Sequence, residues 1–302
     1  WGSASVMAAE LVKVPTFGWS APMQFQVEEA IAKKGTKVLF KHTFSFVKEG
    51  KNHRLSWLST ECLEVNGQKT AGSSLKEQVR NTELIMASNP PMLIGPDGEY
   101  LGAIMTPEII DRMVAVIAQT YPQRSKESNE KFAKVLATPA GQDTYARILG
   151  QYWNTWVGQW RAAPLKGNVA MTNQVELQLG LGLSTPAMMV FQNYGESSTE
   201  TKGFTRLVCE EHAYGPDYAK AMTKLMAKAD QTGSTNLPVV ISIDRRTTYE
   251  TLIDLSTLRP ITASRKTQMA MEAKGEPPTK GVEEYEYRFF WPDEGRVKKS
   301  DK

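Results

Sequence analysis

The chain has 302 residues, of which 41% are hydrophobic and 23% charged, and its formal net charge is +3. This composition is typical of a globular protein that buries one large core or two modest ones. A charge this small argues against a nucleic-acid partner. No run approaches the roughly 18 apolar residues of a transmembrane helix, so we expect no membrane-spanning segment.

The two cysteines, Cys62 and Cys209, bear on the compartment. Each lies in a strand-like run, which favours one long-range disulfide that closes a loop of ~150 residues and contributes roughly 4–5 kcal/mol. The alternative is two buried free thiols, as in many cytoplasmic proteins. We favour the disulfide, and with it a periplasmic or secreted location. A start at Trp1 instead of Met also fits a mature chain that has lost a signal peptide, or a trimmed one.

Residues 6–104 are expected to form a first block of strands. A short helix is predicted at 25–33, ended by Gly35. Alternation of apolar and polar residues then predicts paired strands at 37–48 and 54–65. A further strand is predicted at 75–86, and a hairpin follows over the Pro96-Asp97-Gly98 turn.

Residues 105–165 read as a helical insert. Thr106 and Pro107 have the residue types of an N-cap and first turn, so a helix is predicted to begin there. A second helix is predicted at 127–137 and a third at 140–162. The third has a large apolar face at helical spacing, formed by Tyr145, Leu149, Tyr152, Trp153, Trp156 and Trp160.

Residues 166–291 read as a second strand block with one helix, at 216–231. Strands are predicted at 171–181, 187–194 and 203–211, and three long alternating strands at 237–255, 261–271 and 284–291. Residues 292–302 are expected to be a loose, charged tail. We therefore predict a single α+β domain over 1–302. Its curved antiparallel sheet would be built from both halves of the chain, with helices packed on the concave face.

No sequence motif for catalysis stands out. The chain has no Gly-x-Ser-x-Gly, no Walker loop and no His-Glu-x-x-His, so we expect no cofactor and favour a protein that is not an enzyme. Cys209 and His212 have the spacing of a metal-ligand pair, but no second pair accompanies them and we expect no metal site. An enzyme with an unfamiliar site around Glu210, Glu211 and His212 remains an alternative.

The aromatic helix face is the feature that most favours ligand binding. It has two interpretations, a pocket wall for an apolar ligand or a core-filling helix face. The thirteen methionines favour a soft interior that could accept a lipid tail. The candidate ligand-binding residues are Trp153, Trp156, Trp160, Met188, Phe191, Met222 and His42, the last with a hydrogen-bonded core histidine as its alternative.

One turn gives a likeness to a known group. The strands at 247–255 and 261–271 flank the sequence Asp254-Leu255-Ser256-Thr257-Leu258-Arg259-Pro260. Together with the overall plan, this resembles the half-barrel lipoprotein carriers of the bacterial periplasm and related envelope proteins. The resemblance implies an antiparallel sheet that cups helices, and it assigns no functional residue.

The expected function is that of a non-enzymatic, extracytoplasmic binding protein for an apolar small molecule or a lipid. The first alternative is a structural or interaction module of the cell envelope with a filled core. Its partner would dock on an apolar patch or on an open sheet edge, for which 284–291 is the candidate.

Overall fold

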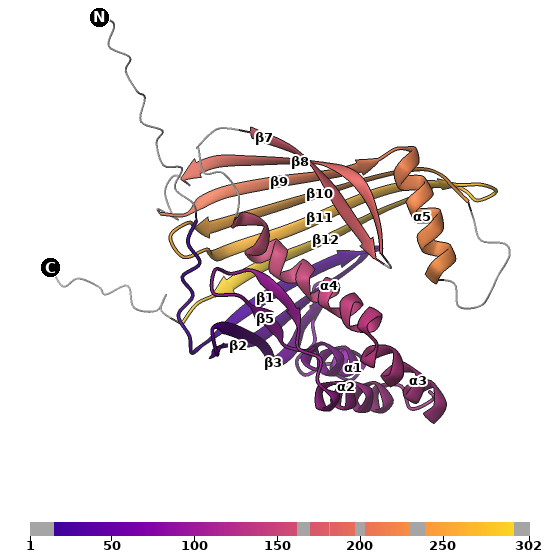
Figure 1. The fold of residues 1–302 in the computed structure, drawn as a ribbon. Helices are drawn as coiled ribbons and strands as arrows, with labels where there is room; N and C mark the ends of the chain where they lie inside the picture. Colours follow the sequence, from indigo (N-terminus) through magenta and orange to yellow (C-terminus); the bar gives the residue numbers. More distant parts are fainter. Residues whose placement is uncertain (1–14, 162–169, 181, 197–202, 230–238, 293–302) are drawn as a thin grey trace, which may run out of the picture.

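The structure is a computed structural model that describes residues 15–161, 170–180, 182–196, 203–229 and 239–292. Within them, twelve strands form one antiparallel sheet that does not close, accompanied by five α-helices (Figure 1). The early strands are β1 (Met23–Lys33), β2 (Thr36–Glu49), β3 (Asn52–Val65), β4 (Gln68–Lys69), β5 (Met92–Ile94) and β6 (Tyr100–Ala103). The late strands are β7 (Ala170–Gly180), β8 (Leu183–Glu196), β9 (Thr205–Tyr214), β10 (Val240–Asp254), β11 (Arg259–Ala273) and β12 (Thr279–Phe290).

The two halves of the chain meet where β1 pairs with β12. The strand order is β6-β5-β3-β2-β1-β12-β11-β10-β9-β8-β7, with β4 paired to β3. Glu29 of β1 lies opposite Tyr287 of β12 in this central ladder. The prediction of one antiparallel sheet from both halves is therefore confirmed. The prediction that 284–291 is an open edge is wrong, because β12 is paired on both sides.

The helix predicted at 25–33 is wrong, since these residues belong to β1. The run Glu28-Glu29-Ala30-Ile31-Ala32-Lys33 favours a helix by propensity alone. Phe25, Val27 and Glu29 are nevertheless buried at every second position, as a strand requires. Pairing with β2 on one side and β12 on the other outweighs the local preference.

The strand predicted at 75–86 is also wrong, because the segment forms α1 (Leu75–Ala87). Its glutamate, glutamine, arginine and leucine residues are good helix formers. The helix packs along β3. There the Glu83 carboxylate accepts a hydrogen bond from the backbone N–H of Cys62 at 2.7 Å. On this edge β3 pairs with β5 at one end and with β4 at the other, and Cys62 lies between the two pairings. Glu83 thus accepts the hydrogen bond of a backbone N–H that has no strand partner there.

The helical insert matches its prediction closely. It consists of α2 (Pro107–Thr120), α3 (Lys126–Ala137) and α4 (Pro139–Trp156), followed by a 3₁₀ turn, η1 (Gly158–Trp160). The Thr106 hydroxyl accepts the N–H of Ile109, as predicted for an N-cap. The last helix, α5 (Pro216–Ala229), packs against β7–β10.

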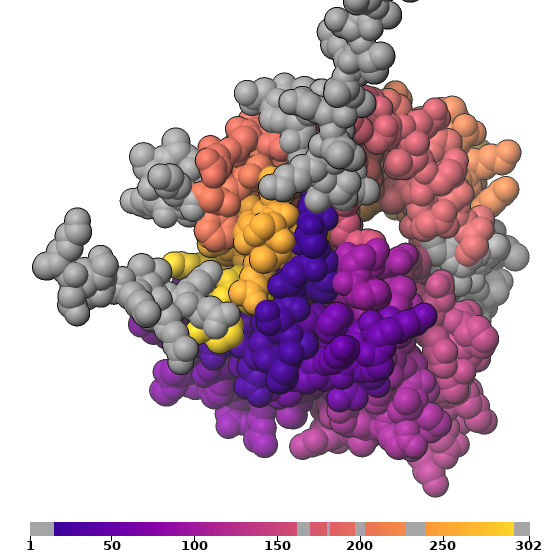
Figure 2. Space-filling model, turned by 60° about the vertical axis from the view of Figure 1, so that its left-hand side comes forward, coloured from indigo at the N-terminus to yellow at the C-terminus, as the bar shows by residue number. Residues whose placement is uncertain are grey.

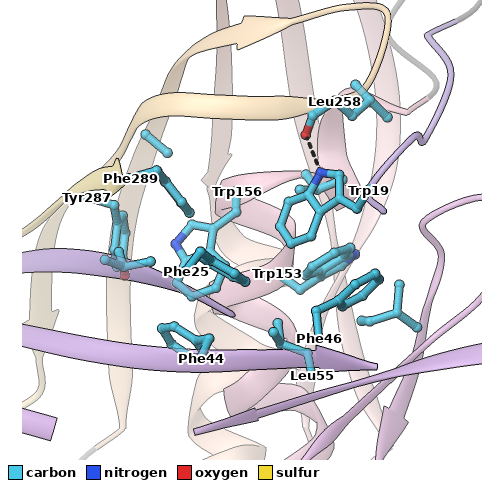
Figure 3. Packing of buried hydrophobic residues seen from close by; sticks show 14 of the residues in the cluster. Trp19, Phe25, Phe44, Phe46, Leu55, Trp153, Trp156, Leu258, Tyr287 and Phe289 are labelled. Carbon is cyan, nitrogen blue, oxygen red and sulfur yellow. Dashed lines mark hydrogen bonds between the residues drawn. The ribbon is translucent and has the colours of Figure 1, made fainter. Parts of the chain in front are cut away.

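An aromatic core lies between α4 and the sheet (Figure 3). We call the side of the sheet that carries Phe25, Phe44 and Phe289 the core face, and the other side the outer face. Trp156 of α4 makes edge-to-face contacts with Phe44 and Phe289, at ring-centroid distances of 5.4 and 5.3 Å. Trp153 and Trp156 are almost fully buried, so the tryptophan stripe predicted from sequence fills this core.

Three tryptophan N–H groups tie the β5–β6 turn and the β10–β11 connection to this core. The indole of Trp19 donates to the Leu258 carbonyl at 3.1 Å (Figure 3). The indole of Trp153 donates to the Gly98 carbonyl at 2.8 Å. The indole of Trp291 donates to the Pro260 carbonyl at 2.8 Å. The segment before β1 lies between the β10–β11 turn and the β5–β6 turn, where it is visible as the indigo strip in Figure 2. Packed aromatic side chains therefore cover the ends of the strands at which the β5–β6 and β10–β11 turns lie.

The predicted disulfide is absent. Cys62 and Cys209 are free and buried, on β3 and β9. Five strands lie between β3 and β9 in the sheet order, and neighbouring strands are ~4.8 Å apart. A disulfide needs Cα atoms within about 7 Å, so these two positions do not meet. The alternation that placed both cysteines in strands was right, but alternation says nothing about which strands are neighbours.

Candidate functional site

Helix α4 presents a second, polar stripe to a cavity. The stripe has helical spacing and consists of Asp143, Ala146, Arg147, Gly150, Gln151 and Asn154. The tryptophan stripe of the same helix faces the aromatic core. Because α4 separates a packed region from an open one, its polar side chains mark the position of a candidate site.

The cavity has two adjoining chambers, which we call the two-chamber cavity. The larger has a volume of about 560 Å³ and lies between α4 and residues of β6, β7, β9 and β10. The smaller has a volume of about 220 Å³ and extends over β10, β11 and β12. Both chambers are lined by Gln151, Arg245 and Tyr249. The larger chamber lies within the size range of small-molecule sites, ~300–1,000 Å³.

Strand β10 shows how the core face is divided along its length. Ile253, near the β10–β11 turn, is buried in the aromatic core. Tyr249 and Arg245 come next on the same face of the strand and line the cavity. Ile243 and Val240 follow in a separate apolar cluster beneath α5. We call this the α5 cluster: Ala187, Ala213, Tyr218, Ala219, Val240 and Ile243, with Val175, Leu177, Leu179, Met222, Met226 and Met271 packed against it.

One ion pair is built into the cavity wall. Arg245 donates to the carboxylate of Glu211 at 3.1 Å, and the Glu211 side chain is only 9% exposed. Burial raises the pKa of the Glu211 carboxyl, while Arg245 and Arg265 oppose that rise. Burial likewise raises the pKa of Tyr249 to about 12, so this phenol is protonated at neutral pH. The pair and the phenol together give the wall both donors and acceptors.

Two further arginines line the cavity without a carboxylate partner within 4 Å among the described residues. Arg265 donates to the Gln151 side-chain oxygen at 2.8 Å, and its guanidinium lies 4.3 Å from the Tyr285 ring centroid. Its Nε atom is buried and has no hydrogen-bond partner. Arg147 lies one helical turn before Gln151 on α4 and lines the larger chamber. Both guanidinium groups therefore have hydrogen-bonding capacity to spare.

A separate polar cluster is buried in the core. Nε2 of His42 lies 2.9 Å from Oε2 of Glu29, and Nδ1 of His42 lies 2.9 Å from the Thr60 hydroxyl. The second carboxylate oxygen of Glu29 has no hydrogen-bond partner. Burial, and then the Glu29 charge, raise the pKa of the hydroxyls of Tyr152 and Tyr287 well above the ordinary range. This cluster lies inside the core and does not line the two-chamber cavity.

The residues proposed from sequence for ligand binding do not line the two-chamber cavity. Trp153, Trp156 and Trp160 are at most 1% exposed and lie in the aromatic core, while His42 is in the buried polar cluster. Met188 is on the outer face opposite His212 and is 37% exposed. The remaining two pack at the borders of the apolar clusters: Phe191 at the aromatic core and Met222 at the α5 cluster.

The alternative site around His212 is split between the two sheet faces. Glu211 and Cys209 are buried on the core face, whereas His212 pairs with Asp244 at 2.8 Å on the outer face. Glu210 also points outward, because it alternates with Glu211 along β9. These groups therefore do not converge in one cleft. No group of three or more potential metal-ligating side chains occurs in the part of the chain that the structure describes.

The cavity residues carried a signal in the sequence that pointed to them. Arg245 and Tyr249 share strand parity with Ile243 and Ile253, so a charged residue occupies a position that faces the core. On α4, Arg147 and Gln151 repeat at a spacing of four beside the tryptophan stripe. Charged residues at positions that otherwise face the core therefore point to this cavity, whereas the aromatic stripe points to the core.

No protein-family model matches this chain, and a search of curated proteins finds no significant match. Among the helices in the described ranges, none combines the length and the apolar character needed to cross a membrane.

Proposed function

We propose that this protein binds an apolar or lipid-like ligand, without chemical conversion, in the two-chamber cavity. The observation that carries the proposal is the cavity itself, about 560 Å³ in its larger chamber, beside a core that is otherwise closely packed. Its volume lies within the range of small-molecule sites, and the residues that line it include both apolar and hydrogen-bonding side chains.

The proposal includes a sheet that curves around α4, with the cavity in its concave side. Supporting this, β6 and β7 are the two ends of the sheet order, and residues of both line the larger chamber. Tyr100 of β6 donates to the Ala146 carbonyl of α4 at 2.6 Å, and Leu177 of β7 lines the same chamber. A sheet whose ends both approach one helix encloses that helix.

The α5 cluster adjoins the cavity, and the apolar chain of the proposed ligand extends toward it. Leu177 lines the larger chamber and also packs against the α5 cluster. Met222, Met226 and Met271 belong to that cluster, and methionine side chains adapt readily to ligands of different shape. Each buried CH₂ group contributes about 0.8 kcal/mol, so affinity should rise up to about fourfold per methylene.

Native mass spectrometry of gently purified protein, followed by titration with saturated fatty acids of increasing length, tests the proposal. Ala146→Trp, which fills the cavity from α4, should abolish binding. Ile148→Trp is the matched control, because Ile148 is on the same helix but is 47% exposed. The proposal would be overturned if the purified protein carried no ligand in native mass spectrometry and if its affinity for added fatty acids did not depend on their chain length. Location is not part of it, because the free cysteines remove the main argument for an oxidising compartment.

A further inference from the structure

We infer that the ligand of the two-chamber cavity is an acidic amphiphile whose anionic head group is bound by Arg147 and Arg265. This inference rests on the proposed function and specifies the chemistry of one end of the ligand. It depends on how the charges that line the cavity are paired.

Three of the six charged side chains that line the cavity have ion-pair partners. Arg245 is paired with Glu211, and Glu283 of the smaller chamber is paired with Lys33 outside it. Outside these two pairs, the charged side chains that line the cavity are Arg147, Arg265 and one carboxylate, Asp143, which is exposed on α4. The unpaired charge around the cavity is therefore positive.

The two arginines lie in adjoining chambers: Arg147 lines the larger and Arg265 the smaller, and Gln151 lines both. Arg265 is held by the Gln151 side chain at 2.8 Å and by the Tyr285 ring, so its orientation is fixed before a ligand arrives. Arg147 lies one helical turn from Gln151, on the same stripe of α4. Guanidinium groups bind carboxylate and phosphate oxygens through paired, charge-assisted hydrogen bonds.

The neighbouring groups favour the same orientation of the ligand. Tyr249, whose pKa is raised to about 12 by burial, and Gln151 add neutral donors between the two chambers. Leu177 leads away from these donors toward the α5 cluster. An acid head group near α4 and an apolar chain toward α5 would satisfy both regions at once.

Three ligands with one sixteen-carbon chain test the inference: palmitic acid, hexadecyl phosphate and hexadecanol. Wild-type protein should bind both acids at least about tenfold more tightly than the alcohol. The double variant Arg147→Gln/Arg265→Gln should lose that preference while keeping its affinity for the alcohol. Arg112→Gln, at an exposed position on α2, is the control and should behave as wild type.

The outcomes separate this inference from the proposed function. Equal binding of acids and alcohol by wild type, or a double variant that still prefers acids, overturns the head-group assignment but leaves the binding function intact. Failure of all three ligands to bind overturns both. The relative affinities of the carboxylate and the phosphate then identify which acid fits better. Circular dichroism of the double variant establishes that any loss is not due to unfolding.

Discussion

Nε2 of His42 and Oε2 of Glu29 lie 2.9 Å apart on neighbouring strands of the core face, and both side chains are at most 2% exposed. A buried pair of this kind adds little stability over apolar residues of similar size. Removing one partner is costly, because the other is left buried without compensation. The pair therefore matters chiefly through the cost of separating its two partners.

Glu29→Leu should lower the free energy of unfolding by ~1–3 kcal/mol, because it leaves an imidazole nitrogen of His42 buried without its hydrogen-bond partner. The double variant Glu29→Leu/His42→Leu should recover most of that loss. Urea denaturation at pH 7 measures both, and Glu28→Gln on the outer face is the control. A single variant that loses less than about 1 kcal/mol would show that the two groups are not coupled.

The buried carboxyl of Glu211 should make stability depend on pH. Burial raises its pKa above the ordinary 4.5, although Arg245 and Arg265 oppose the shift. The folded state thus holds this proton more tightly than the unfolded chain does. As pH rises from below 4.5 through the folded pKa, wild type should lose stability relative to Glu211→Gln.

Unfolding free energies of the two proteins at pH 4 and pH 8 provide the check. Glu210→Gln, on the outer face of the same strand, is the matched control. A difference between wild type and Glu211→Gln that does not change with pH would contradict the prediction.

The turn between β10 and β11 should show the opposite pH dependence. Burial raises the pKa of Asp254, but hydrogen bonds from Ser256 and Thr257 outweigh it and bring the net value below the ordinary 3.8. Its contribution is present above pH 3.8 and is lost as pH falls through the folded pKa. Asp254→Ala should cost ~1–2 kcal/mol at pH 7 and less at pH 3, as followed by urea denaturation. A cost that is the same at both pH values would refute this account of the turn.

The free cysteines give a chemical prediction. Protein isolated without reductant should show two reactive thiols per chain after unfolding in guanidinium. In the native state both should react slowly with a thiol reagent at pH 8. Burial raises the pKa of Cys209 to about 12 and also raises that of Cys62, so little thiolate is present. Cys62→Ser and Cys209→Ser should each leave one thiol. A count of zero in unfolded wild type would restore the disulfide.

Much of the architecture could be predicted from local patterns. Alternation located the long strands, and the Thr106 N-cap and the Trp153 stripe located the helical insert. Predictions failed where strand pairing outweighed local preference, as in β1, or where a helix forms against a strand edge, as in α1. Which strands become neighbours is a long-range property, and for that reason the pairing of Cys62 with Cys209 was predicted wrongly.

The site was harder to predict than the fold. Large aromatic residues suggested a ligand wall, but they are also the most effective core fillers, and Trp156 is buried for that reason. The cavity depends on inward-facing Arg245 and Arg265, which look like solvated strand charges until the two sheet faces are known. Both arginines lie on the same strand face as buried apolar residues. A charged residue in such an alternating apolar pattern is therefore a sign of a polar site.

The most direct test of the central claim is a binding titration of palmitic acid against wild type, Ala146→Trp and Ile148→Trp, measured by calorimetry. The cavity beside α4 predicts saturable binding to wild type and to Ile148→Trp, and none to a folded Ala146→Trp protein. Equal binding by all three proteins would show that the ligand binds elsewhere, and absence of binding by wild type would contradict the account.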